Sequence, residues 1–142
     1  MNYLWLIFAL LSAFFAALVA IFGKIGLQNL DTNTATAIRA ITMALFLFVV
    51  ITIEGKLSQI STILADHKAA AFILLSGIAG GLSWLFYFLA LKLSSVDKVV
   101  PIDRLSIVFA VLLAAVLLGE KLTLKIAVGA ILMIIGAIFI AI

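Results

Sequence analysis

The class of fold is set by the stretch VVPIDRLSIVFAVLLAAVLLGE, which runs from Val99 to Glu120. Its apolar part, Val99 to Leu118, has about the 20 residues with which an α-helix crosses a lipid bilayer. Pro101, Asp103 and Arg104 stand near its start, although a charged side chain at the bilayer centre costs about 2.5 to 3.5 kcal/mol. At a rise of ~1.5 Å per residue, Asp103 lies only about 6 Å inside the span, where its side chain can reach the head groups. A functional and a structural interpretation of these charges are equally open.

The composition is that of an integral membrane protein. Of 142 residues, 68% are hydrophobic and 11% are charged, whereas soluble domains have roughly 25% charged residues. Because the chain has no cysteine and its one histidine, His67, stands in a polar segment, we expect no disulfide, metal site or other cofactor. No basic cluster lies outside the apolar stretches, which argues against nucleic-acid binding.

Four more apolar segments accompany the opening stretch. Each has about the 20 residues of a membrane span, and each must be helical because hydrocarbon offers the backbone no hydrogen-bond partner. The first lacks a basic leader and exceeds the length of a signal peptide, so we expect an uncleaved helix. The sequence predicts an all-α membrane protein with five transmembrane helices and termini on opposite sides. The four segments are Tyr3 to Phe22, Ala35 to Ile53, Ala69 to Leu91 and Leu124 to Ile142.

The links between these segments predict how the helices begin. The link Asp31 to Thr34, DTNT, offers N-cap residues for the second helix, which places Arg39 about one turn inside it. The longer polar link from Glu54 to Lys68 contains STILADHK, for which we expect a short interfacial helix. Pro101 is assigned to the first turn of the fourth helix, where proline is tolerated, so no hinge within the membrane is expected.

Pairs of glycines mark faces for close helix packing. Gly77 and Gly81 in the third helix have the spacing of small residues that let membrane helices approach closely. Gly129 and Gly136 in the last helix repeat after seven residues, which fits a left-handed helix contact in an oligomer or bundle.

Polar and aromatic residues of the third helix are candidates for lining a substrate cavity. Trp84 lies roughly 12 Å from the Lys92 end of the helix, too deep for the aromatic belt at the membrane surface. An indole N–H at that depth requires a partner, so Trp84, Tyr87 and the neighbouring Ser83 are cavity candidates, with ordinary helix packing as the equal alternative.

The charged residues of two helices are expected at similar depth. The second and fourth helices begin on the same side of the membrane, so Arg39 and Asp103 could pair and lower the cost of burying both. Arg104 points about 100° away from Asp103, so the two cannot face the same narrow site. We expect Arg39 and Asp103 to line or gate one mouth of a cavity.

The basic residues give no clear orientation in the membrane. Four lysines lie in loops on the N-terminal side of the membrane and three lie on the other side. The other side has five basic residues if the shallow Arg39 and Arg104 are added to its lysines. A chain without such a bias can insert both ways. Two copies could then pair as an antiparallel dimer around a shared cavity at the midplane, as inverted repeats do in secondary transporters.

From Gly80 onward the sequence resembles the C-terminal part of an EamA domain of the drug/metabolite transporter superfamily. The resemblance rests on a glycine-rich third helix ending in YFLALK, a fourth helix closing in LLGEKLT, and GAILMIIGA in the last helix. Weaker similarity extends upstream through Arg39 to FGKIGL at the end of the first helix.

The resemblance implies one EamA-like transmembrane domain over residues 1–142, in a multi-pass protein of the prokaryotic cytoplasmic membrane. Typical members have two such five-helix repeats in inverted orientation, so a single repeat implies a homodimer. Many of them carry a proline nearer the middle of the fourth helix, at the position of Ile107, whereas here Pro101 precedes it. The first helix also lacks the carboxylate that the small multidrug relatives use, which argues against proton and cation antiport of that type.

Two hypotheses of different classes follow. The first is a homodimeric secondary transporter that moves a small organic metabolite or drug-like solute by alternating access. The alternative is a non-transporting membrane subunit that stabilises a larger assembly and co-purifies with a partner. An enzyme is not expected, because no arrangement of histidine, serine and carboxylate lies at depth. A primary pump is not expected either, because the sequence has no phosphate-binding loop.

Overall fold

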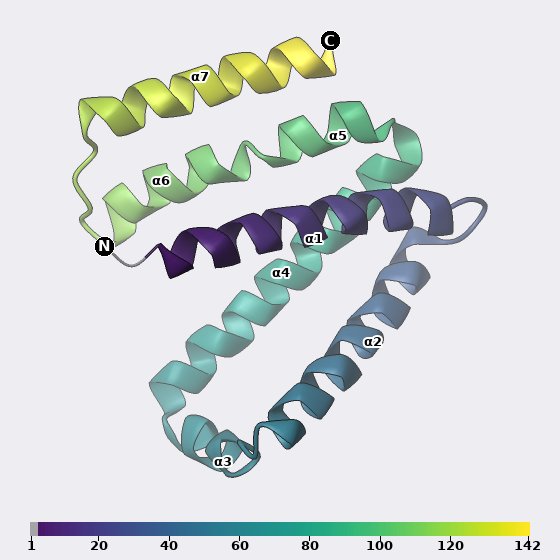
Figure 1. The fold of residues 1–142 in the computed structure, drawn as a ribbon, viewed down its shortest axis with the longest axis vertical. Helices are drawn as coiled ribbons and strands as arrows, with labels where there is room; N and C mark the ends of the chain where they lie inside the picture. Colours follow the sequence, from purple (N-terminus) through teal and green to yellow (C-terminus); the bar gives the residue numbers. More distant parts are fainter. Residues whose placement is uncertain (1–2) are drawn as a thin grey trace. The chain divides into compact units, whose positions relative to one another are not determined.

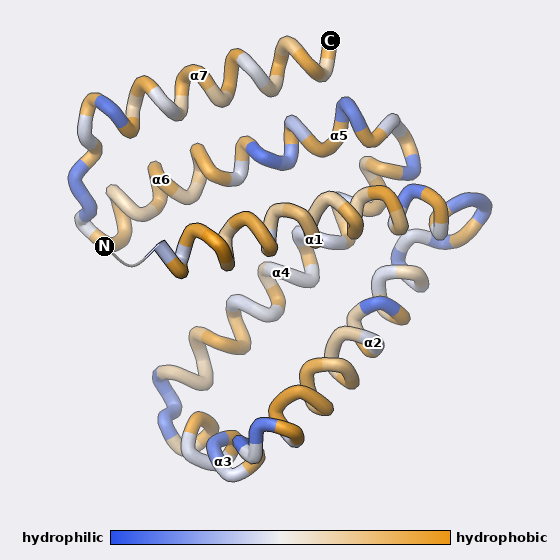
Figure 2. The backbone as a smooth tube through the Cα atoms, viewed as in Figure 1, coloured by the Kyte–Doolittle hydropathy of each residue, from blue (hydrophilic) through white to orange (hydrophobic). Residues whose placement is uncertain are grey.

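The computed structural model of the chain describes residues 3–142 and is helical throughout its ordered elements. Five stretches within these residues are long and apolar enough to cross a membrane, which confirms the prediction of five spans. The hydrophobic colouring runs along the helices, and the hydrophilic colouring concentrates at their ends and links (Figure 2). The helices are α1 (Leu4–Gly26), α2 (Thr32–Ile53), α3 (Ser58–Ala65), α4 (His67–Leu93), α5 (Val96–Asp103), α6 (Ser106–Leu117) and α7 (Leu124–Ala141) (Figure 1).

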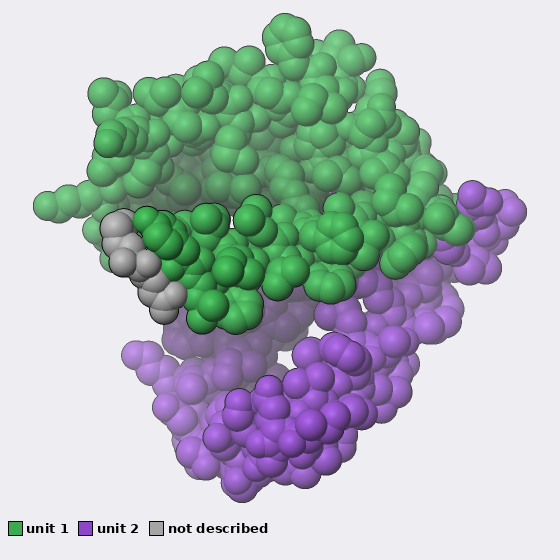
Figure 3. Space-filling model, viewed as in Figure 1, with its two compact units in different colours: residues 1–25, 90–142 green, residues 26–89 purple. Residues whose placement is uncertain are grey.

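The chain divides into two compact units. Unit 1 comprises residues 1–25 and 90–142, and unit 2 comprises residues 26–89 (Figure 3). Most large apolar side chains of both units are exposed. In a protein with this many apolar spans, lipid and other helices are what cover such surfaces.

Unit 2 holds α2, α3 and most of α4, with α3 at the turn between the two long helices (Figure 1). Asp31 caps α2 as predicted: its Oδ1 accepts hydrogen bonds from the backbone N and the Oγ1 of Thr34, both at 2.8 Å. The helix therefore begins at Thr32 rather than Ala35. Arg39 lies seven residues beyond that start, about 10 Å along the axis. The predicted depth of one turn was wrong, because the threonines after the cap are helical.

Substitution of the α2 cap should measurably weaken the fold. Asp31→Ala leaves the first N–H groups of α2 without their side-chain acceptor, and we expect the free energy of unfolding to fall by about 1 kcal/mol. SDS-titrated unfolding in mixed micelles, followed by far-UV circular dichroism, measures the change. Asp31→Asn keeps an acceptor oxygen and should lose only a few tenths of a kcal/mol; equal losses in the two variants would contradict the capping role.

The polar link before α4 contains the short helix that its sequence predicts. This helix, α3, spans Ser58–Ala65, and its Ile60, Ile63 and Leu64 are exposed. Asp66 then caps the start of α4 by accepting hydrogen bonds from the backbone N–H groups of Lys68 and Ala69 at 3.1 and 3.0 Å. The helix is confirmed, and its place at the membrane surface stays a prediction.

The fourth span differs from its prediction, because it begins earlier and is broken. α5 begins at Val96, after Ser95 in extended conformation, so Pro101 lies inside the helix and not in its first turn. Proline has no N–H to offer the carbonyl four residues back. The helix then breaks at 104–105, where the Leu105 N–H bonds the Ile102 carbonyl at 3.0 Å with the tighter three-residue spacing. The assignment of Pro101 to the first turn of the span was therefore wrong.

In unit 1, α7 packs against α5 and α6 (Figure 1). Gly119 ends α6 in the left-handed region with φ +69°, a conformation in which a side chain would be strained. The turn is closed by the Glu120 N–H, which bonds the Ala114 carbonyl at 3.3 Å. Thr123 caps α7 by accepting from the Ile126 N–H at 3.3 Å.

Candidate substrate site

An arginine stacked on aromatic rings is the most distinctive feature of unit 2. The guanidinium carbon of Arg39, on α2, lies 3.6 Å from the ring centroid of Trp84 and 5.5 Å from that of Phe88, both on α4. Trp84 meets Tyr87 edge-to-face at 5.3 Å and Phe88 at 5.6 Å. We call Trp84, Tyr87 and Phe88 the aromatic cluster. It holds an arginine against α4 within the membrane-spanning part of the chain.

The stacking lowers the free-energy cost of a charge within a membrane span. A cation over an aromatic face is stabilised by about 2 kcal/mol or more when desolvated, which offsets much of the insertion cost of an arginine. Arg39 is half-buried and forms no hydrogen bond or ion pair with the described residues of unit 2. One face of the guanidinium is therefore covered, while its N–H edge has no partner from that unit.

The aromatic cluster contains two of the three cavity candidates on α4. Trp84 and Tyr87 are half-buried and touch each other, whereas Ser83 is exposed and belongs to none of the ring contacts. Phe88 was not among the cavity candidates, although it is only 4% exposed. Its position one helical turn after Trp84 is the signal that could have found it.

The other two charged candidates lie at the helix break of unit 1. Asp103 is the last residue of α5 and is half-buried, and Arg104 follows in the broken turn and is exposed. Neither forms an ion pair with the described residues of that unit. Discontinuous helices supply exposed backbone groups and charges to the substrate sites of many transporters. The pairing of Arg39 with Asp103 joins residues of the two units and stays a prediction.

The glycine faces are open within their own units. A Cβ atom built on each would meet no atom within 4 Å among the described residues of its unit, apart from its own helix. Close packing on these faces stays a prediction, and it requires a partner that these units do not supply. The glycines concerned are Gly77, Gly81, Gly129 and Gly136.

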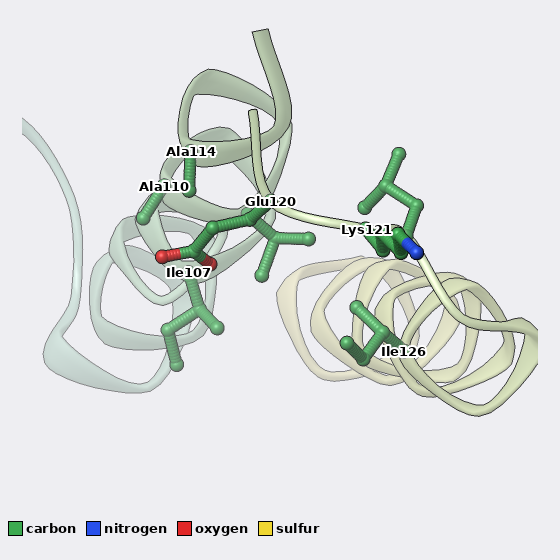
Figure 4. Close-up of a pocket in the computed structure, with 8 residues that line it drawn as sticks. Ile107, Ala110, Ala114, Glu120, Lys121 and Ile126 are labelled. Atoms are coloured by element: carbon green, nitrogen blue, oxygen red, sulfur yellow. The ribbon is translucent and has the colours of Figure 1, made fainter. Parts of the chain in front are cut away.

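A small apolar cavity lies in unit 1 between α6 and the start of α7 (Figure 4). Its volume is about 330 Å³, and Ala110, Ala114 and Ile126 contribute to its lining. The Glu120 carboxylate lies on the α6 side, near Ile107, while the Lys121 ammonium lies toward α7 (Figure 4). Apart from Glu120 and Lys121, both in the link to α7, the lining is apolar and offers few polar groups for the recognition of a solute.

A lysine tether in unit 1 could not be read from the sequence. The Nζ of Lys24, in the last turn of α1, donates to the backbone carbonyls of Leu91 at 2.5 Å and Ser94 at 2.6 Å. These carbonyls belong to the C-terminal end of α4, where a helix has unpaired acceptors and a partial negative charge. Lys24 therefore caps a helix that lies 67 residues away in sequence.

Five apolar spans define a multi-pass membrane protein. The chain matches the EamA-like transporter family over residues 3–142, and it belongs to that family, as its sequence motifs indicated. A relative from Sinorhizobium sp, named "Uncharacterized transporter in cobO 3'region", is 38% identical over 142 residues, which cover 100% of this chain and 99% of that protein. No solved structure matches. The family and this relative point to a transporter and not to an enzyme.

Proposed function

We propose that the protein is a secondary transporter that moves a small organic metabolite or drug-like solute across the prokaryotic cytoplasmic membrane by alternating access, as a homodimer. The proposal rests on membership in the EamA-like family and on one observation above the others, the stacking of Arg39 on Trp84. An ionisable residue inside a membrane span is costly and most often marks a substrate or ion pathway. Residues 1–142 would act as one transmembrane domain.

Each candidate residue has a role in this proposal. Arg39, Trp84 and Tyr87 would form one wall of the cavity, with Ser83 beside them on α4. Asp103 and Arg104 would lie at the mouth, because the break between α5 and α6 lets the two halves of the span move separately. Solute binding could then shift the equilibrium between states that open to either side.

An antiparallel homodimer would complete the cavity. Residues 1–142 hold one five-helix repeat, and two such repeats would together enclose a solute; the same 142 residues cover 99% of the relative from Sinorhizobium. The face of α7 that carries Gly129 and Gly136 is open within unit 1, and small residues of this kind allow helices to approach closely. We propose that this face meets α7 of a second, oppositely inserted copy.

Disulfide cross-linking tests the orientation of the two copies. The chain has no native cysteine, so Gly129→Cys and Gly136→Cys each introduce a single thiol. The two positions lie about 10 Å apart along α7, whereas a disulfide joins Cα atoms about 4.4 to 6.8 Å apart. In an antiparallel pair, Gly129 of one copy faces Gly136 of the other. Differently tagged copies carrying the two variants should cross-link with each other, and neither variant should cross-link with itself.

The opposite pattern would contradict the proposal. A parallel pair would cross-link each variant with itself and would give no mixed product. No cross-linking at all, together with recovery of the chain only in company with a different membrane protein, would favour a subunit of a larger assembly. Thr62→Cys in α3, which lies outside the spans, is a control that should give no specific product.

A further inference from the structure

The aromatic cluster leaves the guanidinium of Arg39 in a geometry suited to an anion. Its Cζ lies 3.6 Å from the Trp84 centroid, which places the guanidinium against the indole ring. A guanidinium carries its five N–H donors at its edge, in a planar fork that matches the two oxygens of a carboxylate. Nothing within unit 2 occupies these donors among the described residues.

The other charged residues of unit 2 also favour an external anion as the partner of Arg39. Around Arg39 the contacts of the unit are aromatic rings, which stabilise the cation but accept no strong hydrogen bond from its edge. The acidic residues of this unit, Asp31, Glu54 and Asp66, lie at the helix ends, where they cap a helix or pair with a lysine. A desolvated guanidinium gains most from a charge-assisted pair of hydrogen bonds to an anion.

We propose that the substrate carries a carboxylate, which binds the N–H edge of Arg39 while its apolar body lies against the aromatic cluster. This inference rests on the proposed transport function and narrows its substrate to organic acids and zwitterions.

Trp84 itself can report on binding. The chain has two tryptophans, and Trp5 is 68% exposed on α1, so Trp5→Phe leaves Trp84 as the single fluorophore. Purified Trp5→Phe protein in dodecyl maltoside is titrated with benzoate, benzamide and benzylamine, which share a ring and differ in charge. Benzoate should change the Trp84 emission saturably, and the other two should not.

Substitutions at Arg39 separate charge from geometry. Arg39→Lys keeps the positive charge but loses the planar fork, and we expect the Kd for benzoate to rise about tenfold or more. Arg39→Met should abolish the saturable change. Lys125→Gln removes an exposed positive charge at the start of α7 and should leave the Kd unchanged.

Several results would overturn the inference. These are an equal response to benzamide or benzylamine, no response to benzoate, or an unchanged Kd in Arg39→Lys. A lipid phosphate is the other anion that could fit the same donors. Benzoate binding that is lost when phosphatidylglycerol is added to phosphatidylcholine nanodiscs would assign the site to lipid and not to a solute. These measurements are made at equilibrium, so their failure leaves the cross-linking and thiol-labelling tests of the proposed function standing.

Discussion

Lys24→Met should lower the free energy of unfolding by about 2 to 4 kcal/mol. The Lys24 ammonium donates to the carbonyls of Leu91 and Ser94 at 2.5 and 2.6 Å, and hydrogen bonds from charged groups contribute about 1.5 to 3 kcal/mol each when partly buried. The ammonium also opposes the partial negative charge at the end of α4. Methionine keeps an unbranched apolar stem of similar length, so the loss reports on the charged head group.

SDS-titrated unfolding in mixed micelles measures this loss, and a second lysine provides the control. Lys56 pairs with Glu54 at 2.7 Å, but the two side chains are 51% and 46% exposed. Exposed ion pairs of this kind contribute about 0 to 1 kcal/mol, so Lys56→Met should be nearly neutral. If the two variants lose the same amount, Lys24 does not cap α4.

Leu91→Ala should cost about 2 to 4 kcal/mol, because Leu91 is the one large side chain with 0% exposure among the described residues. Removing a fully buried leucine loses its packing contacts and leaves a cavity that neighbouring residues fill only in part. Far-UV circular dichroism during SDS titration measures the change on the same scale as for Lys24→Met.

Leu93 is the matched control, since it lies in the same last turn of α4 but is 78% exposed. Leu93→Ala should change the free energy of unfolding by no more than about 0.5 kcal/mol. A comparable loss at both positions would mean that helix propensity, and not burial, determines the effect at Leu91.

The number and approximate limits of the spans could be predicted, because a bilayer leaves an apolar segment no choice but to be helical. The first residue of a span was harder to predict, since α5 begins after Ser95 without a capping hydrogen bond from that side chain. Ser95 precedes α5 where Val99 was expected to begin the helix, and this moved Pro101 from the first turn into the helix interior. The break at 104–105 follows Pro101 in the helix interior, and the spacing of apolar residues gives no indication of it.

The candidate site was predictable only in part, because some of its contacts leave no local pattern in the sequence. Trp84 and Tyr87 stand out in sequence because their polar groups lie deep in an apolar helix. Phe88 has no polar group, so only its position one helical turn after Trp84 indicates that it shares their face, and its contacts place it in the aromatic cluster. The tether from Lys24 to the end of α4 joins segments 67 and 70 residues apart, and no local pattern indicates which lysine will reach which carbonyl.

The accessibility of position 83 from the two sides of the membrane tests alternating access most directly. Ser83→Cys places one thiol beside the aromatic cluster, and Ile78→Cys places one on the α4 face about 140° from Ser83 and about 120° from Trp84, where the native side chain is 62% exposed. A membrane-impermeant maleimide is applied to proteoliposomes either outside or trapped inside. A thiol reacts as its thiolate, which requires water, so Ile78→Cys in lipid should stay unlabelled.

We expect Ser83→Cys to be labelled to completion from either side alone, because every cavity opens to both sides in turn. Labelling that stops at about half from each side would mean oppositely inserted copies that do not change state, and labelling from neither side would mean a closed helix contact. Either result would contradict the proposed transport mechanism.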